Sequence, residues 1–506
     1  MMNLARLIFT AALAAFCIVF SPAASADSHY PLFDGESLKG WSGNPEFWRV
    51  EDGAIVGQTT KEKPTKGNTF LIWEDGEVDD FELLVDYKIE GGNSGIQIRS
   101  FPLEGSADQW RVGGYQSDID ATGKFTGIIY GEQFRGILCP LGKKAEMGDD
   151  HKSKVTGEVG DPAAIKAGVT EGWNTFRIVA QGHTIKQFIN GNQTAELVDN
   201  DTEMRRRGGL LALQLHAGPP MKVSFKNIKL KRLPMEGVKK IALLAGNPSH
   251  GRGAHEHRAG CLLLAKLLNE NAGDRVHAVV YDQGWPRDAS ALVNADAVVM
   301  FCDGGGRHPA KFHLKELGEF MAREGKGMGC IHYGVEIPKG EGGEEFTDWI
   351  GGYFEAHWSV NPHWLAKFDA FPEHPVTRGV EPFEVQDEWY YHMRFRDGMQ
   401  GVTPILTALP PADTLKRGDG PHSGNPSVRA AVLERKEPQH MAWVSERKNG
   451  GRGFGFTGAH FHKNWTDDNF RKTVLNSLVW IAGAEVPEGG VQTETPTAAE
   501  IEANQD

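Results

Sequence analysis

Apolar and polar residues alternate along much of the chain between residues 30 and 233. In FELLVDYKI, Phe81 and Leu83 fall on one side of a predicted strand, and in SGIQIRS, Ile96 and Ile98 do the same. Glycine-containing turns separate these short runs, and no helical period lies between them. The pattern predicts an all-β sandwich for this half of the chain.

From Val238 onward the pattern changes to apolar runs of strand length that alternate with helical periods. VKKIALLAG and ADAVVMFCD have the character of buried strands, and RAGCLLLAKLLNE and FHLKELGEFMAREGK that of amphipathic helices. This alternation predicts an α/β domain over residues 239–483, with a parallel sheet covered by helices on both faces. Ligands of such sheets bind at the carboxyl ends of the strands.

The two ends of the chain differ from these domains. Residues 1–26 carry Arg6 before a short apolar run and end in Ala24-Ser25-Ala26, a pattern typical of a secretory signal peptide. We therefore expect a periplasmic or secreted protein. Residues 485–506 contain six acidic and no basic residues, which predicts a disordered acidic tail.

Composition narrows the classes of partner. A chain of 506 residues is longer than one core usually supports, so two domains are expected. The net charge of −13 argues against nucleic acid or an anionic membrane as a partner. The five cysteines include no CxxC pair, so a zinc knuckle or redox motif is not supported.

Several strands of the first region place chemically useful side chains on one face. The shared features are amides, carboxylates, a guanidinium and an imidazole, with aromatic rings nearby, at Gln97, Arg99, Gln116, Asp118, Asp120, Gln214, His216, Trp110 and Tyr115. Each alone would suit a solvated strand face. Together they favour a concave sheet that binds carbohydrate.

The motifs LFDGESLKGW, NSGIQIRS, GYQSDI and LQLHAGPPMKVSFKNIKL, in this order, resemble the 3-keto-disaccharide hydrolase family. The resemblance covers residues 30–233 and implies a concanavalin- or laminarinase-like jelly roll. It also implies action on glycosides whose carbon 3 hydroxyl has been oxidised to a ketone. Gln116 stands where members of that family often carry Glu.

The chemistry that the resemblance implies begins at carbon 2, whose proton is acidified by the neighbouring ketone. A general base removes this proton, the enolate expels the group on carbon 1, and water then adds, which differs from glycosidases that flank the bond with two carboxylates. We expect His216 or Asp118 as the base, Arg99 as the stabiliser of the enolate, and Glu132 from a nearby loop. The expected substrate-binding residues are Gln97, Gln116, Gln214, Tyr115 and Trp110.

Histidines concentrate in the second domain, where fifteen of the nineteen lie between His250 and His462. Those near predicted strand ends are His250, His255, His257, His308, His332, His460 and His462, and a shared site is expected there. They could bind a metal or act as proton shuttles and hydroxyl donors. Two places offer ligands for a divalent cation (Zn, Ca or Mn): Asp118 with Asp120, and His255 with His257.

SHGRGAHEHRAG, DGGGRHP, GKGMGCIHYG and GRGFGFTGAHFHKNW resemble the ThuA-like, trehalose-utilisation family, which has the class I glutamine amidotransferase-like fold. Amidotransferases carry a catalytic cysteine at the turn after a central strand. Here His332 falls at that turn and Cys330 lies two residues earlier, so glutamine hydrolysis is disfavoured; a shift in register by two would make Cys330 the nucleophile. The resemblance implies handling of sugars.

The preferred hypothesis is an exported enzyme that cleaves 3-keto-glycosides in its first domain, while the ThuA-like domain binds or transforms the oxidised sugar. The alternative is a jelly roll that binds carbohydrate without catalysis. In that case the ThuA-like domain would be either the only enzyme or itself a sugar-binding module.

Overall fold

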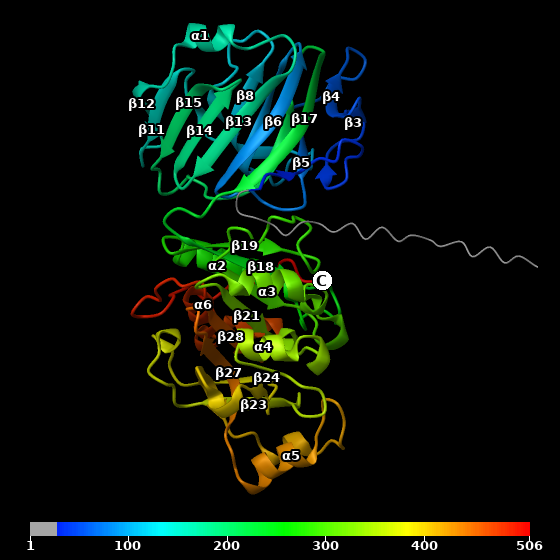
Figure 1. Cartoon of the computed structure of the whole chain (residues 1–506), viewed down its shortest axis with the longest axis vertical. Coiled ribbons are helices and arrows are strands. Elements are labelled where there is room, and N and C mark those ends of the chain that lie inside the picture. The colour runs from blue at the N-terminus through cyan, green and yellow to red at the C-terminus, as the bar shows by residue number, and fades with distance from the viewer. Residues whose placement is uncertain (1–27) are drawn as a thin grey trace, which may run out of the picture.

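The structure, a computed structural model, describes residues 28–506. The predicted signal peptide therefore lies outside the described residues. The chain forms a β-sheet domain and an α/β domain stacked end to end (Figure 1).

The first domain is a sandwich of two sheets that are antiparallel except for one parallel pair, β11 with β15. The first sheet follows the order β12 (Ser153–Glu158), β11 (Lys143–Met147), β15 (Asn192–Asp199), β14 (Thr184–Ile189), β13 (Asn174–Gln181), β6 (Phe81–Glu90), β17 (Met221–Arg232), β4 (Ala54–Thr59) and β3 (Trp48–Glu51), with β1 (Tyr30–Pro31) beside β17. The second follows β10 (Gly136–Cys139), β9 (Ile129–Glu132), β8 (Val112–Asp120), β7 (Asn93–Pro102), β16 (Leu210–Leu215), β5 (Thr69–Trp73) and β2 (Trp41–Ser42). One short helix, α1 (Pro162–Ala167), precedes β13.

The core of this domain lies between the two sheets. Leu83 and Val85 of β6 are fully buried in it, as are Ile96 of β7 and Leu213 of β16. Their positions follow the period of two along each strand, which sends alternate residues to opposite faces. The predicted all-β sandwich is confirmed.

The second domain is built on a seven-stranded sheet. Its order is β19 (Val276–Tyr281), β18 (Lys239–Ala245), β20 (Ala297–Phe301), β21 (Gly327–Ile331), β28 (Arg452–Phe456), β27 (Gln439–Glu446) and β26 (Val402–Ala408). The pairs from β19 to β28 are parallel, whereas β27 and β26 are antiparallel at one edge. The helices are α2 (His257–Asn271), α3 (Leu314–Ala322), α4 (Gly343–Trp349), α5 (Pro426–Arg429), α6 (Asp468–Ile481) and α7 (Ala498–Glu502).

Both faces of this sheet are covered. Ile241 and Leu243 of β18 pack into a core that includes residues of α2 and α6, whereas Ala242 and Leu244 pack into another that includes residues of α3 and α4. A strand that is buried on both faces is expected to be continuously apolar, as VKKIALLAG is. The predicted α/β class is confirmed, with a mixed rather than a purely parallel sheet.

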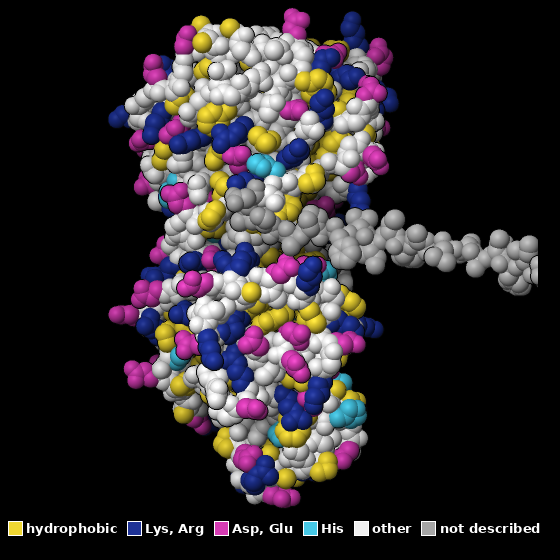
Figure 2. All heavy atoms as spheres, in the orientation of Figure 1, with side chains coloured by type: hydrophobic (Ala, Val, Ile, Leu, Met, Phe, Trp, Pro, Cys, Tyr) yellow, Lys and Arg dark blue, Asp and Glu magenta, His cyan; other side chains and the backbone are white. Residues whose placement is uncertain are grey.

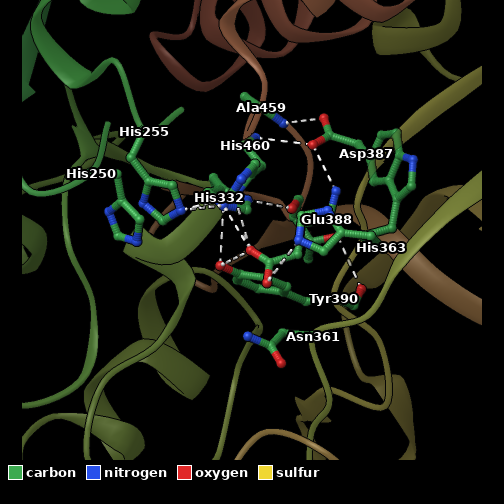
Figure 3. A network of polar contacts seen from close by, with 12 residues as sticks. His250, His255, His332, Asn361, His363, Asp387, Glu388, Tyr390, Ala459 and His460 are labelled. Carbon is green, nitrogen blue, oxygen red and sulfur yellow. Dashed lines mark hydrogen bonds and ion pairs between the residues drawn. The ribbon is translucent and has the colours of Figure 1, made fainter. Parts of the chain in front are cut away.

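Two strand pairs lie outside the main sheet and were not predicted. They are β22 (Gly352–Tyr353) with β25 (Arg394–Phe395), and β23 (His363–Phe368) with β24 (Phe383–Glu388). The second pair matters for function, because β24 ends in an acidic dipeptide that faces the carboxyl ends of the parallel strands (Figure 3).

The prediction of a disordered tail at residues 485–506 is wrong. Val486, Val491 and Ile501 are buried in the second domain's core, and α7 begins with a capping box between Thr497 and Glu500. These three aliphatic residues anchor the segment to the domain. A prediction from composition misses them, because acidic residues dominate the segment.

In the view of Figure 2, acidic and basic side chains are interspersed over both domains. Within residues 28–506, no helix is long and apolar enough to cross a membrane.

A buried charge network joins the two domains. Asp79, which precedes β6, contacts Arg232 of β17 at 3.1 Å and Lys240 of β18 at 2.5 Å, and all three side chains are almost inaccessible to solvent. Arg232 also contacts Asp288 of the second domain at 2.7 Å. Burial alone would raise the pKa of Asp79, but Lys240 and Arg232 outweigh this effect and hold the pKa below its ordinary value.

We predict that Asp79→Asn lowers the free energy of unfolding by about 3–5 kcal/mol, because it leaves buried cations without their shared counter-ion. Urea denaturation measures the change. Glu51→Gln, which breaks the solvent-accessible pairs of Glu51 with Arg49 and Lys222, serves as the control and should leave the midpoint near that of the wild type. Equal effects of the two substitutions would contradict a structural role for Asp79.

Candidate functional site

The polar face of the second sheet centres on Asp118 of β8. Asn93 donates a hydrogen bond to one oxygen of this carboxylate at 2.6 Å, and Gln116 donates one to the other at 3.2 Å. Gln97 in turn donates to Gln116 at 2.7 Å. A chain of amides therefore leads across β7 and β8 to one carboxylate.

Asp118 is only 5% exposed, and its burial raises its pKa to about 7 despite the hydrogen bonds from Asn93 and Gln116, which act in the opposite direction. Gly95 lies opposite Asp118 on β7, and a Cβ there would meet the Gln116 side chain at 2.5 Å. Glycine at this position therefore lets Gln116 lie across the sheet next to the carboxylate. A carboxyl group with a pKa near neutrality is suited to act as a general base.

Gln214 of β16 is fully buried, yet neither atom of its side-chain amide has a hydrogen-bond partner among residues 28–506. Leaving a buried amide unsatisfied costs about 1–3 kcal/mol. A buried amide of this kind obtains its hydrogen bonds from an ordered water molecule or from a ligand.

Two further polar residues, Glu132 and Asn68, contact each other beside this face. Glu132 is buried at the end of β9 and accepts a hydrogen bond from Asn68 at 3.0 Å. Asn68 also lines an open cleft of about 620 Å³ together with Phe47, Trp110 and Arg111. Trp110 is half-buried there, and its indole N–H donates to Ser42. The cleft thus approaches the polar face at Asn68, although Asp118 does not line it.

Arg99 does not lie on this face, and its predicted role as stabiliser of the enolate is wrong. Its φ is 46°, and the pairing of β7 with β8 shifts register between Ile98 and Phe101. This bulge turns the guanidinium away, so that it contacts the Asp80 carboxylate at 2.8 Å and the carbonyl of Gly182 at 2.8 Å. Arg99 therefore holds the turn before β6 in place.

Tyr115 and Asp120 also differ from their predicted roles. Tyr115 points into the sandwich core, where its hydroxyl donates to Asp199, because residues next to each other on a strand face opposite sides. Asp120 accepts hydrogen bonds from the backbone of Lys124 and Phe125 and so closes a turn. Asp118 and Asp120 belong to no group of three or more clustered metal-ligating side chains among residues 28–506. His216, half-buried after β16, has its Nδ1 2.5 Å from the carbonyl of Ala217.

The second domain contains a compact cluster of imidazoles at the carboxyl ends of its parallel strands (Figure 3). His332 follows β21 directly and has a φ of 53°, and His255, in the loop after β18, has a φ of 52°. A left-handed backbone at a non-glycine residue is uncommon, and it positions the side chains of both histidines here. His460 reaches the cluster from the loop after β28.

The ring nitrogens of these histidines meet closely. His255 Nε2 lies 3.2 Å from His332 Nε2 and 3.0 Å from His460 Nδ1. Glu388 Oε2, at the end of β24, lies 3.1 Å from His460 Nδ1 and 3.5 Å from His332 Nε2. The four side chains form a group that could hold a metal ion. His250, His255 and Asp303 form a second such group next to it.

Asp387 holds the loop that carries His460. Its carboxylate accepts hydrogen bonds from the backbone N–H of Ala459 at 2.7 Å and of His460 at 3.1 Å, and from the Asn464 side chain at 3.0 Å. Asp387 and Glu388 are neighbours, so one dipeptide both positions His460 and faces it.

Comparison with known families agrees with this division of the chain. Residues 29–231 match the family model described as a 3-keto-alpha-glucoside-1,2-lyase-like domain, and residues 247–481 match the model described as trehalose utilisation, ThuA. The first model covers the β-sandwich and the second the α/β domain, which are called the lyase-like domain and the ThuA domain below. This arrangement confirms the predicted fusion.

Solved structures resemble one domain or the other. For the lyase-like domain they include a provisionally named glycosyl hydrolase from Parabacteroides distasonis ATCC 8503, with 22% identity, covering 41% of this chain and 100% of that one at a TM-score of 0.27. They also include the carbohydrate binding module CBM66 from Bacillus subtilis, with 15% identity, covering 38% and 95% at 0.25. For the ThuA domain, a provisionally named ThuA-like protein from Bacteroides uniformis ATCC 8492 has 17% identity, covering 48% and 91% at 0.35. No curated protein matches the chain.

Three of the histidines predicted for the ThuA domain site lie outside the clusters. His257 Nδ1 is 3.2 Å from the carbonyl of Asn247, its Nε2 is 3.9 Å from Asp303, and His257 belongs to neither group of side chains that could hold a metal ion. His308 accepts the backbone N–H of Ala310 and packs on Phe346. His462 is buried outside both clusters. His250 is exposed and stacks on His255 with ring centroids 3.7 Å apart.

Cys330 is buried inside β21, and burial raises the pKa of its thiol far above the ordinary value. His332 occupies the turn after this strand. The alternative register, with Cys330 as nucleophile, is therefore wrong.

Sequence reasoning missed the residues that β23 and β24 bring to the cluster. Glu388 and Tyr390 contact His332, with the Tyr390 hydroxyl 3.1 Å from His332 Nε2, and His363 lies 3.8 Å from Glu388. The sequence feature that could have revealed them is the DEWYY motif at residues 387–391, in which an acidic pair precedes three aromatic residues.

We predict that Gln214→Met raises the free energy of unfolding by about 1 kcal/mol, because it removes a buried amide that lacks partners. Chemical denaturation measures this change. Gln187→Met is the matched control: Gln187 is equally buried but donates a hydrogen bond to Gly127 at 2.6 Å, so this substitution should destabilise the protein. Destabilisation by both substitutions would show that Gln214 is already satisfied.

Proposed function

We propose that the lyase-like domain cleaves 3-keto-glycosides, with Asp118 as the base that removes the proton from carbon 2. The observation that supports this proposal most strongly is the buried Asp118 carboxyl, whose pKa of about 7 lets it hold and release a proton near neutrality. The match of residues 29–231 to the lyase-like family supports the same substrate class.

The proposed reaction has two steps before water enters. Asp118 takes the proton from carbon 2, and the electrons of that C–H bond form an enolate with the ketone at carbon 3. The enolate electrons then form a double bond between carbons 1 and 2, restore the ketone, and expel the aglycone oxygen, which takes up a proton. Addition of water across the new double bond gives net hydrolysis.

Because Arg99 faces away from the polar face of the second sheet, only neutral amides on that face are assigned to hold the oxygens of the sugar. We assign the enolate oxygen to the Gln214 amide, which lacks a partner in the described chain; because this amide is fully buried, the assignment requires the sheet face to open when the sugar binds. Asn93 and Gln116 would keep the Asp118 carboxylate oriented. His216 is retained as an alternative base, and the ThuA domain is proposed to bind or transform the oxidised sugar.

We also propose that the protein is exported through its N-terminal segment, residues 1–26, and meets an oxidised sugar outside the cytoplasm. Cell fractionation of the native host tests this proposal. Recovery of the full-length chain in the cytoplasm would contradict it.

We predict that Asp118→Asn lowers kcat/KM for a chromogenic 3-keto-glucoside by about 10²–10⁴-fold. For the wild type, kcat/KM should rise with pH through about 7 and then level off, as the carboxyl group loses its proton. Asp120→Asn is the matched control and should retain activity, since Asp120 closes a turn. Full activity of Asp118→Asn would contradict the proposal, and activity that vanishes only in His460→Ala would assign the reaction to the ThuA domain.

The pH dependence of stability tests the raised pKa of Asp118 independently of enzyme activity. Because the pKa of Asp118 is higher in the folded protein than in the unfolded chain, the folded state binds this proton more tightly. The free energy of unfolding of the wild type should therefore fall, relative to that of Asp118→Asn, as the pH rises from about 4 to 7. Parallel pH profiles for the two proteins would show that the carboxyl group is not desolvated.

A further inference from the structure

The four side chains of the imidazole cluster have the spacing of a tetrahedral metal site. A zinc ion with bonds of about 2.0–2.1 Å to its ligands places those ligand atoms roughly 3.3 Å apart. Two contacts of His255 Nε2, to His332 Nε2 and His460 Nδ1, measure 3.2 and 3.0 Å, and two contacts of Glu388 Oε2, to His460 and His332, measure 3.1 and 3.5 Å. Four of the six edges of the tetrahedron thus have the required length.

Hydrogen bonding among the rings accounts poorly for this arrangement. His332 Nδ1 lies 2.8 Å from the carbonyl of Thr457, which can only accept, so this nitrogen carries a proton and the Nε2 of the neutral ring presents a lone pair. His255 Nε2 is close to two other ring nitrogens, yet it can direct a single proton to only one of them. A cation between the rings would accept lone pairs from His255, His332, His460 and Glu388 together, with the Tyr390 hydroxyl, 3.1 Å from His332 Nε2, beside it.

The surroundings fix the ligands as a metal site requires. The contact of His332 with Thr457 sets its tautomer and ring orientation, as the outer hydrogen bond of a metal-bound histidine usually does. Asp387 fixes the backbone of His460. His255 Nδ1 faces the Asp303 carboxylate at 3.8 Å, which is beyond hydrogen-bond distance. The strained backbone at His255 and His332 points both rings to one centre (Figure 3).

We propose that the ThuA domain binds one divalent transition-metal ion through His255, His332, His460 and Glu388, and that the preferred ion is zinc. Three imidazoles and one carboxylate suit zinc and similar borderline cations, whereas Ca²⁺ takes six to eight oxygen ligands and Mg²⁺ is usually held by carboxylates and water. The ion lies where ligands of α/β sheets bind, at the carboxyl ends of the strands. This inference is independent of the reaction proposed for the lyase-like domain.

We predict about one zinc ion per chain in the full-length protein, produced without a histidine tag, stripped with EDTA, incubated with zinc sulfate and gel-filtered. Elemental mass spectrometry measures the content. Substitution by Co²⁺ should give the strong visible absorption of a four-coordinate ion. Glu388→Gln and His460→Ala should each weaken binding by more than about 10-fold, and Glu388→Gln, which nearly preserves shape, keeps the test valid if His460→Ala does not fold.

His250→Ala is the matched control. His250 is exposed and stacks on His255 but is not among the four ligands, so this variant should retain the metal. Loss of zinc from His250→Ala, with Glu388→Gln unaffected, would place the ion at His250, His255 and Asp303 instead and overturn the proposed ligand set. A wild-type protein that retains no zinc or cobalt after gel filtration would overturn the proposal altogether.

Discussion

Withdrawal of polar side chains from water is the physical constraint on which both candidate sites depend. In the lyase-like domain, burial raises the pKa of Asp118 to about 7, although two amides donate to its carboxylate. In the ThuA domain, burial lowers the pKa of His255 to about 3, so that its ring is neutral and presents a lone pair. The same cause thus underlies the base that we propose in one domain and the metal ligand that we propose in the other. At Asp79, two buried cations, Arg232 and Lys240, offset the burial of the carboxylate, whereas the buried amide of Gln214 has no partner among the described residues.

The scaffold positions these groups by simple rules. Alternation along β7, β8 and β16 collects the amides and Asp118 on one face, and parallel strands bring His255, His332 and His460 to one edge. Departures from regular structure decide the details. The bulge at Arg99 removes the only guanidinium predicted for the polar face, and the left-handed backbone at His332 turns its ring into the cluster. The network of Asp79, Arg232 and Lys240 ties the two domains together through buried charges.

Sequence reasoning could predict the features that depend on periodicity. Both fold classes, the shared face of Gln97, Gln116 and Asp118, and the meeting of His255, His332 and His460 follow from periods and strand ends. It failed where one residue breaks the pattern, as at Arg99, since a bulge leaves no clear mark in a short alternating run. It also failed for Glu388, which an inserted hairpin brings from more than fifty residues beyond His332. The ordered tail was missed because three buried aliphatic residues count for little in an acidic composition.

Isotope exchange at carbon 2 of the sugar tests the central claim most directly, since abstraction of that proton is the step that Asp118 is proposed to perform. A 3-keto-glucoside carrying deuterium at carbon 2 should be cleaved more slowly than the unlabelled compound, and the released sugar should have lost the label to water. The corresponding glucoside with its carbon 3 hydroxyl intact should not be cleaved. Equal cleavage of the unoxidised glucoside, or full retention of deuterium in the product, would contradict the account.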